Sequence, residues 1–242
     1  MGDHYIGLEY TISAAATDID GDSISYSWSV DGGSLNNPNV NPVKWKMPGN
    51  AGSYNITVAV DDGNGGQDEK TETVEVLAML SVILPQIPGG GHIQEGGPVK
   101  VNQGPIAGDS LQDRPYRGFL NFDISSLAGK EVISAEMEFN DYAINGDPYP
   151  LIEKIWVESV YWGTDDIKLG DYGIPGDLLG EYDIPAFTCS SQALVDELNQ
   201  AITDGHDKFQ IRLRHKGYST DHDGMPDYII YGLVKFNVSY VP

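Results

Sequence analysis

Cysteine is almost absent from this sequence, which limits how the fold can be held together. Cys189 is the single cysteine among 242 residues, so no intramolecular disulfide can form. Stability must come instead from hydrophobic cores and from any metal ion that the chain binds.

Positive charge is also scarce. The chain carries 14 Lys and Arg residues against 36 Asp and Glu, a formal net charge of −22. Phosphate recognition needs a basic surface, so the composition argues against nucleic acid and against anionic membranes as partners. It favours cations as ligands and an aqueous, often extracellular, setting.

Long apolar runs are missing as well. No run approaches the ~20 residues of a membrane helix, and the opening Met-Gly-Asp-His does not resemble a signal peptide. We expect no membrane insertion in this segment. We also expect it to be part of a longer chain, with any export signal lying elsewhere.

What the first 77 residues do contain is a series of short strands separated by turns. Alternating patterns predict strands at residues 8–14, 24–30, 43–45, 54–60 and 71–77. Trp28 and Tyr54 fall where an immunoglobulin-like sandwich has its buried tryptophan and its corner tyrosine. We therefore expect an Ig-like β-sandwich over residues 1–77.

Acidic residues concentrate in two loops of this region. The loop residues are Asp18, Asp20, Asp22, Asp61 and Asp62. In an Ig-like topology both loops lie at one end of the sandwich, so their carboxylates should meet. Ca²⁺ prefers about six to eight hard oxygen ligands, and the spacing lacks the Gly and Glu positions of an EF-hand. We predict an inter-strand calcium site, with Ca²⁺ as the cofactor.

These loops also carry a family resemblance. Residues 16–28 read Ala-Thr-Asp-Ile-Asp-Gly-Asp-Ser-Ile-Ser-Tyr-Ser-Trp, and residues 60–66 read Val-Asp-Asp-Gly-Asn-Gly-Gly. Together with the strand that opens at Tyr54, they resemble the PKD and cadherin-like modules of microbial surface proteins. The resemblance covers about residues 5–77. It implies a spacer or adhesive unit, and calcium binding is common in such modules.

A Gly- and Pro-rich crossing separates this region from a longer second one. We expect a linker and opening loop at residues 78–97 and a second domain at residues 98–242. Alternating patterns predict its strands at residues 116–124, 132–139, 152–162, 209–215 and 228–240. The second domain is expected to be a larger jelly-roll-type β-sandwich, which makes the whole chain all-β.

One short helix should interrupt the strands of the second domain. Ser190 or Ser191 can cap its N-terminus, and Gly205 stops it. Leu194 and Leu198 belong to the apolar stripe that would face the core.

The second region resembles another family. The carrying segments are Arg-Gly-Phe-Leu-Asn-Phe-Asp-Ile-Ser-Ser-Leu at 117–127, Ile-Ser-Ala-Glu-Met-Glu-Phe at 133–139 and Lys-Phe-Gln-Ile-Arg-Leu-Arg at 208–214. They resemble the DNRLRE-type and disaggregatase-related domains of secreted bacterial and archaeal proteins. The resemblance implies a non-catalytic jelly roll related in shape to carbohydrate-binding modules, without implying particular binding residues.

A third acidic loop lies late in the chain. It places Asp221, Asp223 and Asp227 between two expected strands, in a pattern that resembles the loops of thrombospondin type 3 repeats. The loop is either a further metal site or a solvated hairpin tip, where Asp, Gly and Pro are favoured in any case.

Two pairs of residues in the second domain suggest ligand binding. Trp156 and Trp162 can stack on a sugar, although their shared strand parity with Val160 favours core packing for at least one of them. Arg212 and Arg214 line one face of a strand. They can pair either with a carboxylate of a ligand or with the protein's own acids.

These features predict a non-catalytic calcium-binding structural or adhesion module of a microbial surface or secreted protein. The alternative is a carbohydrate-binding accessory module of a secreted glycan-active enzyme. A glycan or another surface protein is the expected partner. An enzyme in its own right would need a deep cleft with convergent acids, and no nucleophile motif or catalytic carboxylate pair can be picked out of the sequence.

Overall fold

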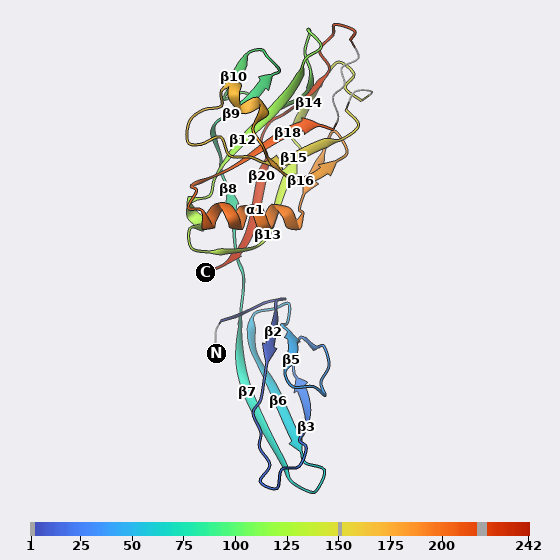
Figure 1. Cartoon of the computed structure of the whole chain (residues 1–242), viewed down its shortest axis with the longest axis vertical. Coiled ribbons are helices and arrows are strands. Elements are labelled where there is room, and N and C mark those ends of the chain that lie inside the picture. Colours follow the sequence, from blue (N-terminus) through green and yellow to red (C-terminus); the bar gives the residue numbers. More distant parts are fainter. Residues whose placement is uncertain (1–2, 150–151, 217–221) are drawn as a thin grey trace. The chain divides into compact units, whose positions relative to one another are not determined.

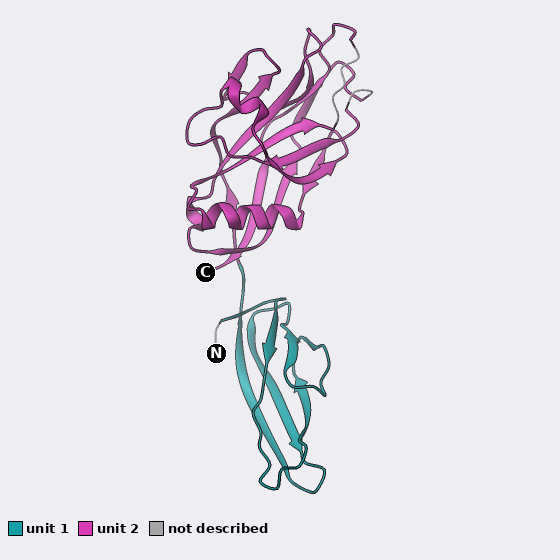
Figure 2. Cartoon of the chain, viewed as in Figure 1, with its two compact units in different colours: residues 1–79 teal, residues 80–242 magenta. Residues whose placement is uncertain are grey.

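The computed structural model describes residues 3–149, 152–216 and 222–242. The chain divides into two compact units, unit 1 over residues 1–79 and unit 2 over residues 80–242 (Figure 2). Strands make up most of the regular structure, with one α-helix and two short 3₁₀ helices in the described ranges (Figure 1). The expected all-β class is confirmed.

Unit 1 is a sandwich of two sheets. One sheet has the strand order β1-β7-β6-β3 and the other has the order β2-β5-β4. The strands are β1 His4–Tyr5, β2 Glu9–Ile12, β3 Ser25–Val30, β4 Ser34–Leu35, β5 Val43–Lys46, β6 Gly52–Asp61 and β7 Gln67–Leu77. β1 is parallel to β7, whereas β6 is antiparallel to both of its neighbours, β7 and β3.

The core of unit 1 lies between these sheets because alternate residues of each strand point inward. Its buried members are Trp28, Val43, Trp45, Met47, Ile56, Val58, Val74 and Val76. Trp28 is thus the buried tryptophan that the pattern predicts. The Tyr54 hydroxyl donates to the carbonyl of Asn50 at 3.1 Å, which fixes the chain at the start of β6.

Unit 2 is a larger sandwich. Its nine-stranded sheet has the order β14-β19-β11-β12-β18-β15-β16, with β9 beside β12 and β10 beside β9, and its second sheet has the order β17-β13-β20-β8. The first sheet is built from β9 Gln86–Gln94, β10 Val99–Val101, β11 Ile106–Asp109, β12 Pro115–Asp123, β14 Tyr142–Asn145, β15 Ile155–Ser159, β16 Asp177–Tyr182, β18 Lys208–His215 and β19 Tyr228–Tyr231. The second is built from β8 Leu80–Leu84, β13 Glu131–Phe139, β17 Phe187–Cys189 and β20 Lys235–Val241.

The helix of unit 2 forms as the sequence predicts. α1 spans Gln192–Thr203, and the Ser191 side chain accepts a hydrogen bond from the Leu194 N–H at 3.2 Å. Leu194 and Leu198 are buried in the main core, and α1 packs against β13 and β16. The described residues contain no helix long and apolar enough to cross a membrane.

The nine-stranded sheet of unit 2 buries residues on both of its faces. The inner face joins the main core with the second sheet. The outer face carries a smaller cluster of buried residues, Ile93, Phe119, Val160, Trp162 and Ile167. Tyr172 and Ile174 pack against this cluster from the short helix η2 Leu169–Gly173 and the residue that follows it.

The expected linker at residues 78–97 is mostly strand instead, because β8 and β9 lie within it. Its glycines allow close approach of neighbouring backbones. A Cβ on Gly90 would lie 2.4 Å from the carbonyl oxygen of Phe119, and one on Gly91 would lie 2.0 Å from that of Lys100. The Gly-rich composition that suggests a flexible crossing here serves tight packing between β10 and β12.

The strand expected at residues 228–240 is divided between two sheets. β19 joins the nine-stranded sheet, and β20 joins the four-stranded one. Between them, the Gly232 N–H donates to the Asp141 carbonyl at 2.9 Å and the Leu233 N–H donates to the Asp141 carboxylate at 2.8 Å. These bonds hold the chain where it crosses from one sheet to the other.

Candidate functional site

The two acidic loops of unit 1 meet through one hydrogen bond. The side-chain amide of Asn64 donates to Oδ2 of Asp22 at 2.8 Å. Within the first loop, the Asp18 carboxylate accepts from the N–H of Asp20 at 2.9 Å and from the N–H of Asp22 at 3.0 Å. The topology thus brings the loops together, as the sequence predicts.

Backbone groups already engage the carboxylates of the second loop. Asp61 accepts from the N–H of Gly63 at 2.6 Å, and Asp62 accepts from the N–H of Asn64 at 2.7 Å and of Gly66 at 2.9 Å. The bonds from Asn64 and Gly66 hold the pKa of Asp62 below its ordinary value. Each carboxylate therefore stabilises its own turn.

No group of three or more His, Cys, Asp or Glu residues within 3–149, 152–216 and 222–242 is arranged to hold a metal ion. The predicted carboxylates do not form a ligand set in this structure: those of Asp18, Asp61 and Asp62 accept backbone hydrogen bonds, and that of Asp22 accepts from the Asn64 side chain. A calcium ion would have to draw them away from these N–H groups. Calcium binding by unit 1 stays a prediction.

Hydrogen bonds hold the described part of the third acidic loop, and those of Asp227 tie it to neighbouring segments. Asp221 lies outside the described residues. Asp223 accepts from the N–H of Met225 at 2.6 Å. Asp227 is buried; its carboxylate accepts from the N–H of Asp147, and its own N–H donates to Asp109 at 3.0 Å. Asp227 thus links the backbone at Asp147 to Asp109, the last residue of β11.

A cluster of arginines and aromatic rings lies on the outer face of the nine-stranded sheet of unit 2. On β15, Ile155 and Val157 point into the main core, so alternation turns Trp156 and Glu158 outward. In the ladder between β15 and β18, Trp156 lies opposite Arg214 and Glu158 lies opposite Arg212. The strand register therefore brings these four side chains together.

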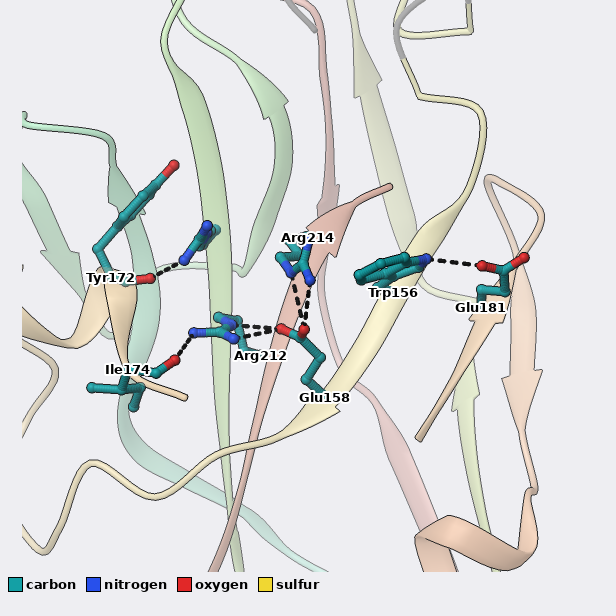
Figure 3. A network of polar contacts seen from close by, with 8 residues as sticks. Trp156, Glu158, Tyr172, Ile174, Glu181, Arg212 and Arg214 are labelled. Atoms are coloured by element: carbon teal, nitrogen blue, oxygen red, sulfur yellow. Dashed lines mark hydrogen bonds and ion pairs between the residues drawn. The ribbon is translucent and has the colours of Figure 1, made fainter. Parts of the chain in front are cut away.

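Glu158 is held between the two arginines (Figure 3). Its Oε2 accepts from Nε of Arg212 at 2.7 Å, and its Oε1 accepts from Nε of Arg214 at 3.0 Å and from Nη2 of Arg214 at 2.8 Å. The Glu158 side chain is 5% exposed and that of Arg212 is also 5% exposed, whereas that of Arg214 is 24% exposed. Arg214 is the partner that reaches the surface.

Two arginine–aromatic stacks flank this ion-pair group. The guanidinium carbon of Arg214 lies 4.1 Å from the ring centre of Trp156, and that of Arg117, on β12, lies 4.1 Å from the ring centre of Tyr172. Arg117 also donates to the carbonyl of Tyr172, and the indole N–H of Trp156 donates to Glu181 at 3.0 Å (Figure 3). Such stacks hold both rings and both cations in place.

A cavity of about 300 Å³ opens among these side chains. It is lined by Pro115, Tyr116, Arg117, Trp156, Tyr172, Arg214 and His215. The lining contains aromatic rings and cations but no carboxylate among the residues that the structure describes. We call this cavity the arginine–aromatic cleft.

His215 is the buried histidine of the cleft lining, only 4% exposed. Neither of its ring nitrogens has a hydrogen-bond partner in the described part of the chain. Burial, and then the charges of Arg214 and Arg117, lower the pKa of His215 to about 4. The imidazole is therefore neutral at physiological pH.

The ligand-binding residues predicted from the sequence lie at different places in the structure. Trp156 and Arg214 line the cleft, and Arg212 lies behind it on Glu158. Trp162 is buried instead, edge-on to Phe119 with ring centres 5.5 Å apart. Core packing is therefore the role of Trp162, as its strand parity allows.

Five residues of the cleft lining were not predicted from the sequence as ligand-binding residues. They are Pro115, Tyr116, Arg117, Tyr172 and His215. Arg117 shares strand parity with Phe119 of the outer cluster and alternates with Leu120 of the main core. This alternation indicates that the Arg117 side chain points away from the main core. Tyr172 comes from a segment with no strand pattern, so its position becomes evident only in the folded chain.

Comparison with protein families finds one match. Residues 6–75 match the PKD domain, which supports the PKD-like assignment of unit 1. This match ends before unit 2, so the DNRLRE-type and disaggregatase-related resemblance of the second region is not confirmed. No curated protein matches the chain.

Comparison with solved structures finds distant likenesses. A SusE-like protein is 12% identical, with 99% of this chain and 96% of that chain covered and a TM-score of 0.32. SGBP-B of the Bacteroides ovatus mixed-linkage glucan utilization locus, in complex with a mixed-linkage heptasaccharide, is 14% identical, with coverage of 98% and 49% and a TM-score of 0.27. CBM51-2 in complex with GlcNAc and INT domains from Clostridium perfringens ZmpB are 10% identical, with coverage of 88% and 41% and a TM-score of 0.23. These scores are too low to transfer a function.

Proposed function

We propose that this chain is a non-catalytic, extracellular or surface-located module whose second unit binds a glycan in the arginine–aromatic cleft. The observation that carries the proposal is the cleft itself. Trp156 and Tyr172 supply flat apolar rings for the C–H face of a sugar, and Arg117 and Arg214 supply fixed donors for its oxygen atoms.

The volume of the cleft sets the scale of the ligand. At about 300 Å³, the cavity lies at the lower end of the range for ligand pockets. It therefore suits one sugar ring better than a long stretch of polysaccharide. A terminal or branching sugar is the expected point of contact.

A binding role fits the cleft better than hydrolysis does. Glycoside hydrolysis ordinarily requires two carboxyl groups on either side of the scissile bond. Among the described residues, Glu158 is the carboxylate directly paired with a cleft arginine, and it is buried between Arg212 and Arg214. Such a carboxylate is held as a counter-ion and is poorly placed to transfer a proton.

The composition of the whole chain agrees with that of a surface protein. Its charge of −22 and its single cysteine suit an exposed module that does not depend on disulfides. Unit 1 carries the PKD match over residues 6–75. In our proposal unit 1 serves as a spacer in a longer chain and unit 2 provides recognition.

The proposal is tested by screening the full chain against a panel of polysaccharides in affinity gels and measuring the hits by calorimetry. Trp156→Ala should weaken binding about tenfold, equivalent to roughly 1.4 kcal/mol. Trp156→Phe retains a ring and should retain most of the affinity. The matched control is Tyr161→Ala, which removes a 50% exposed tyrosine that stacks on His206 away from the cleft lining.

Two outcomes would overturn glycan recognition at this site. One is the absence of binding to every member of the panel. The other is binding that Trp156→Ala leaves unchanged, in a variant whose melting curve shows that it is folded.

Calcium binding by unit 1 is a second proposal, favoured by the bond from Asn64 to Asp22 that joins the two acidic loops. Ca²⁺ would be held by carboxylate oxygens of both loops after they exchange backbone N–H partners for the ion. Its role would be to stiffen this end of unit 1. The corresponding melting experiment is given in the Discussion.

A further inference from the structure

The arginine–aromatic cleft has an excess of positive charge. Three guanidinium groups, those of Arg117, Arg212 and Arg214, lie in one ion-pair and stacking network with the carboxylate of Glu158. A second carboxylate, that of Glu181, bonds to Trp156 and is itself paired with Lys216 at 3.2 Å. The network therefore carries a net charge of two positive. The chain as a whole carries −22, so this concentration of cations runs against its overall composition.

The ion pairs of Glu158 are to Arg212 and Arg214, and its contact with the third cation, Arg117, is only long-range. Both of its oxygens are engaged, Oε2 by Arg212 at 2.7 Å and Oε1 by Arg214 at 2.8 Å. Arg117 contacts the ring and the carbonyl oxygen of Tyr172, and both groups are uncharged. A half-buried cation beside two others is costly unless an anion approaches it.

Electrostatic coupling links the cations that face the cleft. Burial is the main cause that lowers the pKa of Arg117; the charges of Arg212 and Arg214 lower it further, whereas Tyr172 and Glu158 raise it. These groups therefore lie close enough to repel one another. An anion placed between Arg117 and Arg214 would relieve this repulsion.

We infer that the glycan bound in the arginine–aromatic cleft is an anionic saccharide, whose charged oxygen group lies between Arg117 and Arg214. The inference rests on the proposed function and names its ligand class. A guanidinium group presents parallel N–H donors that match the oxygens of a carboxylate or a sulfate. The sugar ring carrying that group would lie against Trp156 or Tyr172.

The acidity of the rest of the chain constrains the form of this ligand. At physiological ionic strength charges are screened beyond about 8 Å, so the cations of the cleft act only on a group that has entered it. A long polyanion would meet many of the protein's carboxylates along its length. A short oligosaccharide, or a chain with isolated acidic sugars, is the expected ligand.

The test uses a matched set of short oligosaccharides and the full chain. One member carries a uronic acid, the second has that carboxylate reduced to an alcohol, and the third carries a sulfate ester instead. Calorimetry at about 0.15 M salt should give an affinity for at least one anionic member that is about tenfold or more above that of the neutral one. Comparison of the carboxylated and sulfated members identifies the charged group.

Substitutions then locate the effect. Arg117→Gln should remove most of the difference in affinity between the anionic and the neutral member, and it should weaken neutral binding only as far as the lost N–H donors contribute to it. Arg214→Lys keeps the charge but loses the paired donors, so it should retain only part of the preference. The control is Lys208→Gln, which removes one positive charge from β18, on the same strand face as Arg212 and Arg214 but bonded to the carbonyl of Thr164. It should leave the preference unchanged.

The outcomes separate this inference from the proposed function. Equal affinity for the neutral and the anionic members would overturn the anionic ligand and leave glycan binding standing. A preference that Lys208→Gln removes as fully as Arg117→Gln would assign it to long-range charge and would also overturn the inference. Binding to none of the three members, together with a negative polysaccharide panel, would overturn both.

Discussion

The two units hold their charged side chains in different ways. In the acidic loops of unit 1 most carboxylate contacts are to groups close by in sequence; Asp18 accepts from N–H groups two and four residues away. In unit 2 Glu158 bonds to Arg212 and Arg214, which are 54 and 56 residues away. Contacts between residues close in sequence stabilise a single turn. Contacts between residues far apart in sequence form only when the whole sheet has folded.

This difference affects how each region can bind a ligand. The arginine–aromatic cleft is built on strands whose register fixes its side chains, so it is preorganised. The acidic loops of unit 1 satisfy themselves with backbone N–H groups. An ion that binds there must compete with those bonds, so its effect should be modest and concentration-dependent.

The largest effect is expected from Glu158→Gln. The change leaves the buried Arg212 and the partly exposed Arg214 without their counter-charge, and breaking a buried ion pair in this way costs about 3–5 kcal/mol. Unit 2 should unfold at a much lower denaturant concentration, whereas the transition of unit 1, which has its own core, should stay in place.

The matched control for this variant is Glu136→Gln, which changes an exposed glutamate on β13. It should alter the free energy of unfolding by less than about 0.5 kcal/mol. Equal unfolding curves for the two variants would contradict the view that the ion pairs of unit 2 are essential to its fold.

The next effect concerns pH and His215. The pKa of this buried imidazole is lowered from 6.5 to about 4, chiefly by burial. The unfolded chain therefore binds a proton that the folded chain does not, and stability falls as the pH falls through this window. The total loss is about 3 kcal/mol, and about 2 kcal/mol of it should be lost by pH 5.

The comparison that isolates this histidine uses His215→Phe, which keeps a ring but cannot be protonated. Other groups titrate alike in both proteins, so the gap between their unfolding free energies at about pH 7.5 and 5 reports His215 alone. Because neither ring nitrogen has a partner in the described residues, the variant should fold. Parallel pH profiles for the two proteins would refute the prediction.

A smaller effect is expected from calcium on unit 1. Extracellular calcium modules bind with a Kd of about 10⁻⁴–10⁻³ M, so ~10 mM Ca²⁺ should stabilise the folded state by roughly 1.4–2.7 kcal/mol. The melting temperature of unit 1 should rise by several degrees. Magnesium should substitute poorly, because it requires tighter octahedral geometry.

Two variants sharpen this measurement. Asp20→Ala, in the first acidic loop, should abolish most of the calcium shift. Asp31→Ala removes a carboxylate whose Oδ1 accepts from the N–H of Asn55 at 2.8 Å, outside the loop pair, and should leave the shift intact. Identical melting curves in calcium and in chelator would refute the metal site.

The sequence predicts unit 1 well because its signals are local. Alternation places Trp28 in the core, and the acidic turns mark the ends of strands. The same local signals mislead at the start of unit 2. The run of glycines around Gly90 has the composition of a linker, but it is required by the close approach of Phe119, which belongs to a strand paired from further along the chain.

The cleft could be predicted only in part, for the same reason. Parity in the sequence places Trp156 and Arg214 each on one face of its strand, and the structure shows that this face is turned away from the main core. Their meeting with Arg117 and Tyr172 depends on which strand follows which in the sheet and on where a loop folds back. Pairing over such separations leaves no periodic trace in a single sequence.

The smallest effect on stability is expected from an exposed ion pair in unit 1, which can be compared directly with the buried ion pair of unit 2. Lys44 and Glu9 form an ion pair at 2.8 Å on unit 1, as close as that between Arg214 and Glu158, but their side chains are 55% and 49% exposed. Water and salt screen such a pair, and ordering two long side chains offsets most of the attraction. Lys44→Gln should therefore leave the unfolding curve of unit 1 unchanged. A loss comparable to that of Glu158→Gln would show that burial does not separate the two units in the way that we argue.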